Sequence, residues 1–222
     1  GNRNRHQDLE HLFDQKYDAV IDISGFTPDH VDSVIKKYSS KIGHYIFIST
    51  TSVYKSPPYQ GLMTEESTRI FLKNSYGGDK SLAENIILNY KNIIPVTIFR
   101  PQGVIGPYDP CLSGLIFYRI INNLPILIGK NFNAKVNHLF IFDLIRVIIF
   151  TIGNSETFGK IYNIADDDAL NLNEFIELCG KICSKNPEIK HEGYISEYKH
   201  NDFIKKKRHV DIIAAWPKFD LI

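Results

Sequence analysis

A tyrosine and a lysine stand four residues apart near the middle of the chain, at Tyr76 and Lys80. In a helix this spacing places both side chains on one face, one turn apart. A free phenol titrates at about pH 10, and a neighbouring ammonium favours the phenolate and lowers the pKa of the tyrosine. Such a tyrosine can take a proton from an alcohol or return one to a carbonyl oxygen. The pair therefore predicts acid–base chemistry at a carbon–oxygen bond, although the same spacing also occurs on ordinary surface helices.

The elements that must position this pair alternate between helices and strands. A helix over residues 67–90 is expected to carry the pair, and Pro28 is expected to begin an earlier helix that runs to about Tyr38. Compact apolar runs predict buried strands at 17–23, 44–49 and 95–100. Strands that alternate with helices through short connections predict an α/β fold with a parallel sheet.

Each of these predicted strands ends in small or polar residues. The ends are residues 24–25, 49–52 and 100–103. Ligands of open parallel sheets bind beyond the carboxyl ends of the strands. The sequence therefore predicts one binding site along this edge of the sheet.

The second half of the chain is less regular. Helices are expected at 115–122, at 144–151 and from Asn171 or Asn173 to about 184, with short strands at 125–128 and 160–165. Asparagine is a favoured helix cap, and Asp143 is likewise expected to cap the helix that follows it.

The composition describes a soluble globular protein rather than a specialised binder. The chain has 222 residues, of which 43% are hydrophobic and 23% charged, enough for one core or for a core with a small lobe. A net charge of +1 argues against a general polyanion binder. The apolar runs are too short or too interrupted to span a bilayer. Three cysteines without a complementary ligand set predict no metal site and a reduced, cytoplasmic protein.

The motifs, in this order, resemble the extended short-chain dehydrogenase/reductase family, the NAD(P)-dependent sugar epimerases and dehydratases. The stretches that carry the resemblance are 46–54, 76–80, 100–107 and 162–165, with Asp143 leading into an apolar helix. The resemblance implies a Rossmann-like doubly wound parallel sheet with a small C-terminal substrate lobe. It also implies NAD or NADP as cofactor and a nucleotide-sugar-like substrate.

The resemblance further implies roles for single residues. Tyr76 would be the general acid/base, and Lys80 would lower its pKa and hydrogen-bond the nicotinamide ribose. Thr50 would hydrogen-bond the substrate oxygen, with Thr51 or Ser52 as alternatives. The residues that would line the cofactor are Ser24, Gly25, Ser49, Lys80, Arg100, Pro101 and Gly103. Arg100 could instead be a structural ion-pair partner.

One feature of the family does not occur in this sequence. Its members open with a strand, a Gly-x-x-Gly-x-x-Gly turn and a helix, whereas residues 1–5 resemble the segment after the second strand, where a basic residue meets an adenosine 2′-phosphate. The chain is therefore expected to begin after the first strand–helix–strand unit and to be inactive by itself. The expected domains are a partial cofactor domain, 1–108, and a substrate lobe, 109–222, from which about 137–165 returns to the sheet.

Two other functions are left open. The missing glycine-rich turn would suit a non-catalytic binding module that retains the fold. The short stretch 100–143 and the basic run 205–208 would suit an RNA-binding relative, which the near-zero net charge disfavours. A homodimer is left open, and no membrane partner is expected.

Overall fold

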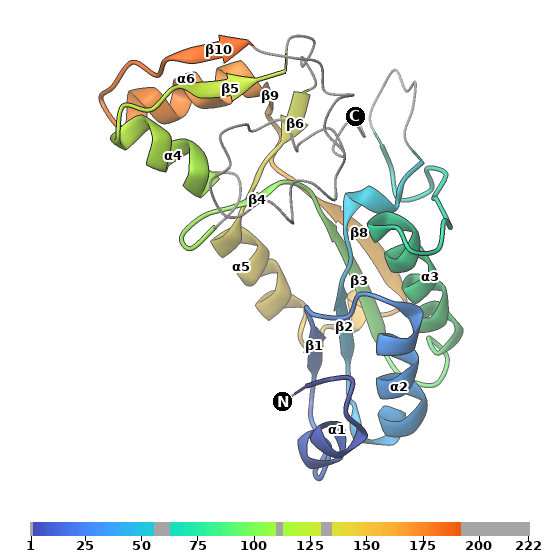
Figure 1. The fold of residues 1–222 in the computed structure, drawn as a ribbon. Helices are drawn as coiled ribbons and strands as arrows, with labels where there is room; N and C mark the ends of the chain where they lie inside the picture. The colour runs from blue at the N-terminus through green and yellow to red at the C-terminus, as the bar shows by residue number, and fades with distance from the viewer. Residues whose placement is uncertain (1, 56–62, 110–112, 130–134, 192–222) are drawn as a thin grey trace. The chain divides into compact units, whose positions relative to one another are not determined.

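The computed structural model describes residues 2–55, 63–109, 113–129 and 135–191 (Figure 1). These residues form two compact units, which are described one at a time. The first unit holds the described residues up to 102 together with 142–164, and the second holds those of 103–141 and 165–191. The division falls at residue 102, where the sequence predicted 108, and the returning segment begins at 142 rather than about 137. The predicted run 205–208 lies outside the described residues.

The first unit is built on a sheet of four parallel strands. In spatial order these are β1 (Val20–Asp22), β2 (Tyr45–Ile48), β3 (Val96–Pro101) and β8 (Lys160–Ile164). Every residue of β2 and β3 is buried, as expected for central strands covered on both faces. The α/β fold with a parallel sheet that the sequence predicted is confirmed.

Helices cover both faces of this sheet. Figure 1 shows α2 (Pro28–Tyr38) and α3 (Tyr76–Asn89) on one side of the strands and α5 (Ile141–Thr151) on the other, with α1 (His6–Leu12) near the amino ends. Helix α2 begins where the sequence predicted, because Thr27 accepts a hydrogen bond from the backbone N–H of His30.

The core of the first unit lies between the sheet and the pair α2 and α3. Tyr45 and Phe47 of β2 pack in one apolar cluster with Ile35 of α2 and Ile87 of α3. These side chains are fully buried, so removing any of them would cost both transfer free energy and packing. The cluster fixes α3, and with it the Tyr76–Lys80 segment, against β2.

Helix α3 is shorter than predicted. It begins at Tyr76 rather than at residue 67, because the Ser75 side chain accepts a hydrogen bond from the N–H of Gly78 and caps the helix there. The preceding residues bond elsewhere: the Ile70 N–H donates to the Val53 carbonyl. The prediction of a helix from residue 67 is therefore wrong, and Tyr76 occupies the first turn of the helix instead of its middle.

A buried ionic group ties α3 to the sheet. Glu84 of α3 accepts two hydrogen bonds from the guanidinium of Arg100, at 3.0 and 2.7 Å. Arg69 donates to the same carboxylate at 2.7 Å, and the Ser49 hydroxyl donates at 2.5 Å. Glu84 and Arg100 are fully buried, and burial of two charges is tolerated only with this degree of pairing.

The same group extends to β8 and to the segment before α3. Arg100 also donates to the Tyr54 hydroxyl and to the Glu65 carbonyl, at 2.8 and 3.0 Å. The Tyr54 hydroxyl in turn donates to Asn163 of β8, whose own N–H donates to the Glu65 carboxylate. Arg100 of β3 thus connects the segment after β2 and the loop at Glu65, and through Tyr54 it is linked to β8.

The second unit is smaller and contains short paired strands. Its helices are α4 (Ser113–Ile121) and α6 (Leu172–Ile182); its strand pairs are β4 (Val104–Ile105) with β7 (Leu139–Phe140), β5 (Ile126–Ile128) with β10 (Ile189–His191), and β6 (Lys135–Asn137) with β9 (Ala169–Asn171). Ile116, Ile126 and Ile176 are among the buried residues of its core.

Asn171, not Asn173, caps α6 in a capping box with Glu174. Asp143 lies inside α5 and pairs with Arg146, so its predicted role as the cap is wrong.

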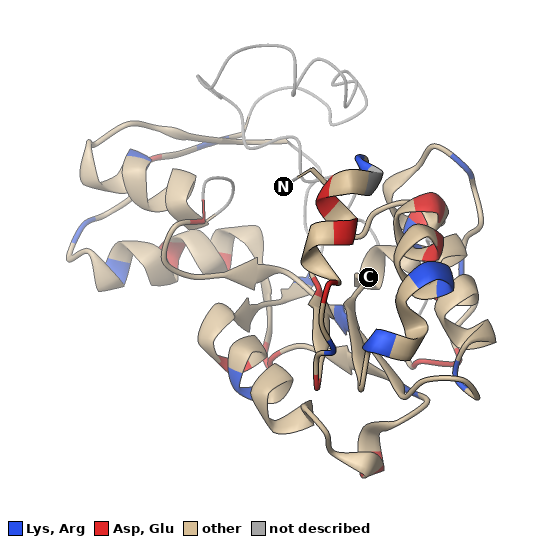
Figure 2. Ribbon diagram, turned by 90° about the horizontal axis from the view of Figure 1, so that it is seen from below, with Lys and Arg blue, Asp and Glu red and all other residues tan. Residues whose placement is uncertain are grey.

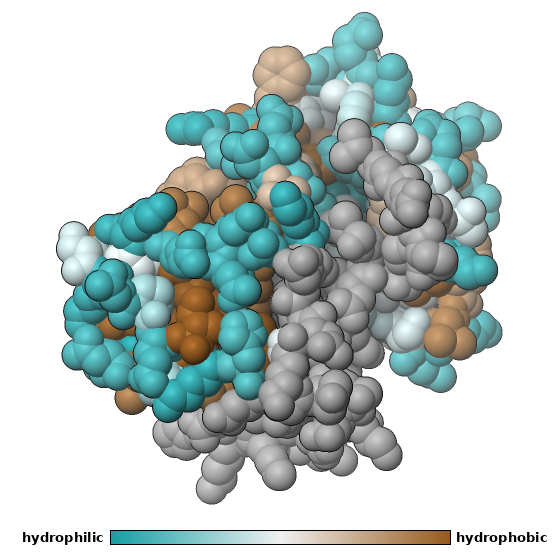
Figure 3. Space-filling view, turned by 90° about the horizontal axis from the view of Figure 1, so that it is seen from above, coloured by the Kyte–Doolittle hydropathy of each residue, from teal (hydrophilic) through white to brown (hydrophobic). Residues whose placement is uncertain are grey.

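The surface of the described residues mixes apolar and polar side chains. Figure 3 shows apolar side chains in patches among hydrophilic ones on one face of the molecule. Phe142, Ile149 and Phe150 of α5 are all exposed, Phe150 to 75%. No helix within the described residues is long and apolar enough to cross a membrane.

The buried carboxylate of Glu84 provides a test of the fold. Glu84→Gln keeps the shape of the side chain but leaves the Arg100 guanidinium without its counter-charge, so the free energy of unfolding should fall by about 3 kcal/mol. Asp143→Asn is the matched control, since it removes the same charge from an exposed pair with Arg146. It should cost about 1 kcal/mol or less. Urea denaturation measures both, and equal losses would contradict the structural role of Glu84.

Candidate active site

The site begins where β2 ends and the chain enters a short turn of 3-10 helix, Thr51–Val53. Thr50 precedes this turn, is buried, and accepts a hydrogen bond from the Ser52 N–H at 3.1 Å. That contact uses a lone pair of the threonine oxygen and leaves its O–H free to donate. Thr50 is thus both a cap, as the sequence suggested, and a hydrogen-bond donor at the carboxyl end of β2.

Two glycines let α3 approach this turn. A Cβ on Gly77 would lie 1.8 Å from the Ser52 carbonyl oxygen, and one on Gly78 would lie 2.0 Å from the Leu72 carbonyl oxygen. Backbone cannot yield as a flexible side chain can, so any side chain here would push the helix away. The sequence showed that both glycines lie in this segment, but only the structure gives the reason. Because neither glycine has a side chain, the first turn of α3 can pack closely, and Tyr76 lies next to Thr50.

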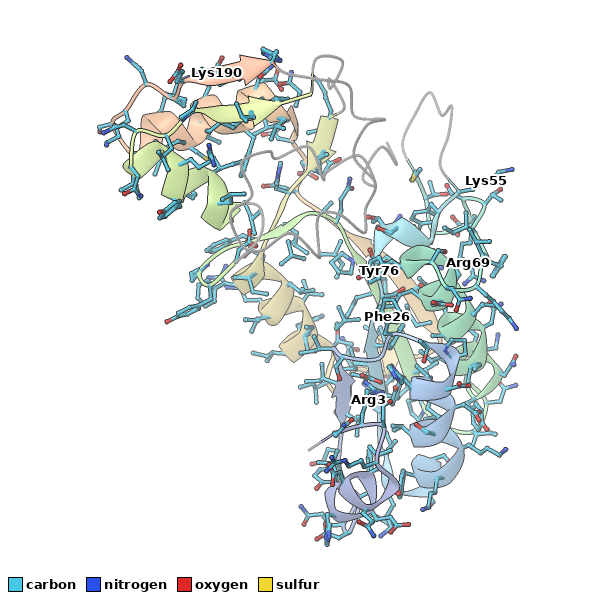
Figure 4. The ribbon with its side chains drawn as sticks, viewed as in Figure 1. Arg3, Phe26, Lys55, Arg69, Tyr76 and Lys190 are labelled. Atoms are coloured by element: carbon cyan, nitrogen blue, oxygen red, sulfur yellow. The ribbon has the colours of Figure 1, made fainter. Side chains whose placement is uncertain are left out.

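Tyr76 and Thr50 meet directly. The Thr50 side chain lies close enough to the Tyr76 hydroxyl to lower its pKa, and Figure 4 shows Tyr76 at the start of α3 beside Phe26. The tyrosine side chain is 44% exposed, so its ring is open to a ligand. Desolvation of the hydroxyl raises the pKa of Tyr76, and the bond from Thr50 opposes that rise.

Lys80 lies one turn further along α3 and is buried. Its ammonium donates to the Ile48 carbonyl at 2.6 Å and lies 4.5 Å from the centre of the Phe47 ring. Burial lowers the pKa of Lys80 to about 8, while the charges of Asp22 and Glu84 oppose the shift. The side chain is therefore mostly a cation at neutral pH, held at the end of β2.

The expected effect of Lys80 on Tyr76 differs from what the structure gives. The lysine is held by a backbone carbonyl, and the pKa of the phenol is raised rather than lowered. The group that favours the phenolate is Thr50, which lowers the pKa of Tyr76. Of the three hydroxyls the sequence left open, Thr50 is the one that reaches Tyr76; Thr51 and Ser52 lie in the turn that follows.

The carboxyl end of β1 carries a second polar group, centred on Asp22. Arg3 donates to both carboxylate oxygens, at 2.8 and 2.9 Å, and to the Ser24 hydroxyl at 2.8 Å. Tyr45 and the Gly25 N–H donate to the same carboxylate, at 2.5 and 2.7 Å. Burial by itself raises the pKa of Asp22, but the bonds from Arg3 and Tyr45 outweigh it and lower the pKa.

This group explains Gly25 and shows what sequence reasoning missed. A Cβ on Gly25 would lie 2.6 Å from the Asp22 carboxylate and 2.8 Å from the Phe47 ring. Arg3, noted from the sequence only as one of the basic residues in 1–5, binds Asp22 and Ser24 within the protein. No spacing signals this contact, since its partners lie 19 and 21 residues away.

Two predicted cofactor contacts have side chains that are already engaged. Ser49 and Arg100 both bond Glu84 and are buried, so neither side chain is free for a ligand. The alternative interpretation of Arg100 as an ion-pair partner is the one that the structure supports. Pro101 ends β3 and is buried, while Gly103, with φ of 48°, belongs to the second unit.

The groups that remain suit a ribose rather than a metal. The Lys80 ammonium has three N–H donors, and within the described residues its acceptor is the Ile48 carbonyl. The other donors can bind a vicinal diol. Ser24 adds a hydroxyl at the end of β1. Among the described residues, no group of three or more His, Cys, Asp or Glu side chains could hold a metal ion.

The model of the NAD dependent epimerase/dehydratase family matches residues 3–165, and the chain belongs to this family. The predicted family, and with it a nicotinamide cofactor as the family's own, is confirmed.

Solved structures with the same fold include several nucleotide-sugar enzymes. An epimerase from Methanothermobacter thermautotrophicus superposes with a TM-score of 0.75 at 17% identity, over 87% of this chain and 65% of its own. A dTDP-glucose 4,6-dehydratase from Bacillus anthracis, in complex with NAD, gives 0.70 at 22% identity, over 87% and 67%. A UDP-glucuronic acid 4-epimerase from Bacillus cereus, in complex with UDP-glucuronic acid and NAD, gives 0.69 at 19% identity, over 87% and 68%.

A curated relative is also similar in sequence. The mitochondrial NADH dehydrogenase [ubiquinone] 1 alpha subcomplex subunit 9 of Dictyostelium discoideum is 26% identical over 149 residues. The match covers 67% of this chain and 36% of the relative. The chain thus spans about a third of the curated relative and about two thirds of the solved structures.

The close approach at Gly77 predicts the effect of a single methyl group. In an open helix, Gly→Ala stabilises by about 0.5–1 kcal/mol. Gly77→Ala should instead lower the free energy of unfolding by about 1–3 kcal/mol, because the methyl group meets the Ser52 carbonyl. Asn89→Ala on the exposed part of α3 is the control and should change stability by less than about 0.7 kcal/mol. Urea denaturation measures both, and stabilisation by Gly77→Ala would contradict the close contact.

The lowered pKa of Lys80 predicts a pH dependence of stability. Because the pKa falls from 10.5 to about 8 on folding, the unfolded chain binds the proton more tightly, and stability rises between these two pH values. The difference in unfolding free energy between the chain and Lys80→Met should grow by on the order of 3 kcal/mol across this range.

Lys37→Met is the control for this measurement. Lys37 is exposed on α2, and Glu10 raises its pKa. The difference in unfolding free energy between the chain and Lys37→Met should therefore show no such rise with pH. A flat difference for Lys80→Met over the same range would contradict the burial of a charged lysine.

Proposed function

We propose that this chain carries the proton-transfer groups of an NAD(P)-dependent epimerase, dehydratase or reductase that acts on a carbinol of a nucleotide-sugar-like substrate. The observation that carries the proposal is the position of Tyr76 at the start of α3, beside Thr50 at the carboxyl end of β2 and one turn before the buried Lys80. The NAD and UDP-glucuronic acid named for the Bacillus cereus neighbour support this substrate class.

The proton chemistry follows from the state of Tyr76. When bound, NAD(P) would supply the acceptor or donor of a hydride at the substrate carbon. The raised pKa keeps the proton on Tyr76 at neutral pH, so the phenol can give it to a carbonyl oxygen. The resulting phenolate is stabilised by the Thr50 O–H. In the opposite direction the phenolate takes the proton of the carbinol.

The same proposal assigns the cofactor contacts. Lys80 would donate its remaining N–H groups to a ribose diol, and Ser24 and Gly25 would border the cofactor at the end of β1. Pro101 and Gly103 keep the roles implied by the family. The predicted inactivity of these 222 residues by themselves, their cytoplasmic location and a homodimer stay predictions.

A second candidate is a non-catalytic binding module that retains the fold. The observation that favours it is the Dictyostelium relative, whose name describes a subunit of a larger assembly rather than a free enzyme. RNA binding has less support: blue and red segments are interspersed over the described ribbon in Figure 2, without one gathering of basic residues.

The catalytic role of Tyr76 predicts a specific loss of turnover. In the protein completed with the glycine-rich unit of the family, and with NAD and either UDP-glucuronic acid or dTDP-glucose, Tyr76→Phe should lower the turnover rate by about 10²–10⁴-fold, because the proton donor is removed. Thr50→Val should lower it by about ten- to a hundredfold, since it removes one hydrogen bond to a charged group. Product chromatography and the absorbance of the reduced cofactor measure both.

Thr51→Val is the matched control, because Thr51 adjoins Thr50 in sequence and the pKa of Tyr76 does not depend on it. It should leave turnover unchanged. Full activity of Tyr76→Phe would refute the proposal. Binding of NAD without turnover of either sugar would favour the binding module.

A further inference from the structure

Tyr76 has an aromatic neighbour that no motif in the sequence indicates. The rings of Phe26 and Tyr76 stack with their centres 5.5 Å apart and their planes at 28°. Figure 4 shows the two side chains together, one from the loop after β1 and the other from the first turn of α3. Aromatic pairs at this distance attract each other in offset geometry, and they restrict how either ring can turn.

Tyr76 receives little support from its own helix. The next two residues, Gly77 and Gly78, have no side chains that could pack against the ring. Asp79 accepts a hydrogen bond from the Asn74 N–H, and Lys80 extends inward to the Ile48 carbonyl. The contacts recorded for the tyrosine side chain within the described residues are therefore Thr50 at its hydroxyl and Phe26 at its ring.

Phe26 itself stands on a well-anchored loop. Its N–H donates to the Nδ1 atom of His30 at 3.3 Å, and the N–H of Gly25 before it donates to Asp22 at 2.7 Å. Thr27 after it caps α2, and Arg3 bonds both Asp22 and the His30 carbonyl. The backbone on each side of Phe26 is thus held by hydrogen bonds, so the phenylalanine ring can serve as a fixed wall.

We infer that Phe26 is a positioning residue for Tyr76: its ring holds the tyrosine ring at the angle at which the hydroxyl meets Thr50. The inference rests on the proposed function, because it concerns the same site. Phe26 makes no proton transfer of its own. Its contribution is to restrict the rotation of a half-exposed tyrosine at the start of a helix, so that the hydroxyl lies where a substrate oxygen would bind.

The stack can be tested without turnover. In the 222-residue chain labelled with ¹³C-tyrosine, the Tyr76 signals are those absent from Tyr76→Phe. Stacking shifts them upfield, and Phe26→Leu should remove that shift and move the Cζ signal that reports the Thr50 bond. Phe26→Tyr keeps a ring and should keep the shift. Phe71→Leu is the matched control, since Phe71 is a similarly exposed phenylalanine whose ring contacts Arg69 instead.

Kinetics then separate positioning from stability. Phe26→Leu should lower kcat by about tenfold with KM nearly unchanged, because a misplaced general acid slows chemistry more than binding. Phe26→Tyr should restore kcat, and Phe71→Leu should leave it intact. Unchanged Tyr76 signals in Phe26→Leu would overturn the inference, as would lost stacking with an unchanged kcat. If the chain, completed with the glycine-rich unit of the family, turns over no sugar, the proposed function fails, while the nuclear magnetic resonance signals of the 222-residue chain alone decide whether Phe26 orients Tyr76.

Discussion

The buried carboxylate of Glu84 is the interaction on which the arrangement of the first unit depends. It accepts hydrogen bonds from Arg100 of β3, from Ser49 at the end of β2 and from Arg69 in the segment before α3. Each of these partners comes from a different part of the chain, and the buried guanidinium of Arg100 depends on this counter-charge. Because Glu84 lies one turn beyond Lys80, the same contact fixes the register of the helix that carries the site.

The close approach between the backbones of α3 and the turn after β2 adds to the effect of the ion pair between Glu84 and Arg100. The carboxylate binds α3 to the sheet, while Gly77 lets the first turn of the helix lie against the Ser52 carbonyl and Gly78 lets it lie against the Leu72 carbonyl. Tyr76 then lies at the end of β2, where Thr50 meets its hydroxyl and Phe26 its ring. The site thus combines Tyr76 and Lys80 of α3 with Thr50 at the end of β2 and Phe26 in the loop after β1. Their convergence is a consequence of packing rather than of any local motif.

The sequence predicted the fold well because its signals are local. The compact apolar runs of β2 and β3 and the Thr27–Pro28 helix start appear in the structure within about two residues of the predicted bounds. The helix over 67–90 was predicted too long, because Ser75 caps α3 and residues 68–70 form hydrogen bonds with the segment after β2, a tertiary contact that the sequence does not indicate. Arg100 shows the same limit: a strand-end arginine can bind a ligand or a carboxylate, and only the position of Glu84 decides between them.

The sequence by itself determined the class of fold, the family and the placement of Tyr76, Lys80 and Thr50 at one edge of a parallel sheet. These features follow from the hydrophobic period, the residue spacing and the order of the strands, all of which are visible in the sequence. The tertiary structure decided how these groups act on one another. It raised the pKa of Tyr76 by desolvation, turned Lys80 toward the Ile48 carbonyl, and brought Phe26 and Arg3 to the site. Desolvation and contacts between distant residues depend on how the elements pack, and no spacing in the sequence records that.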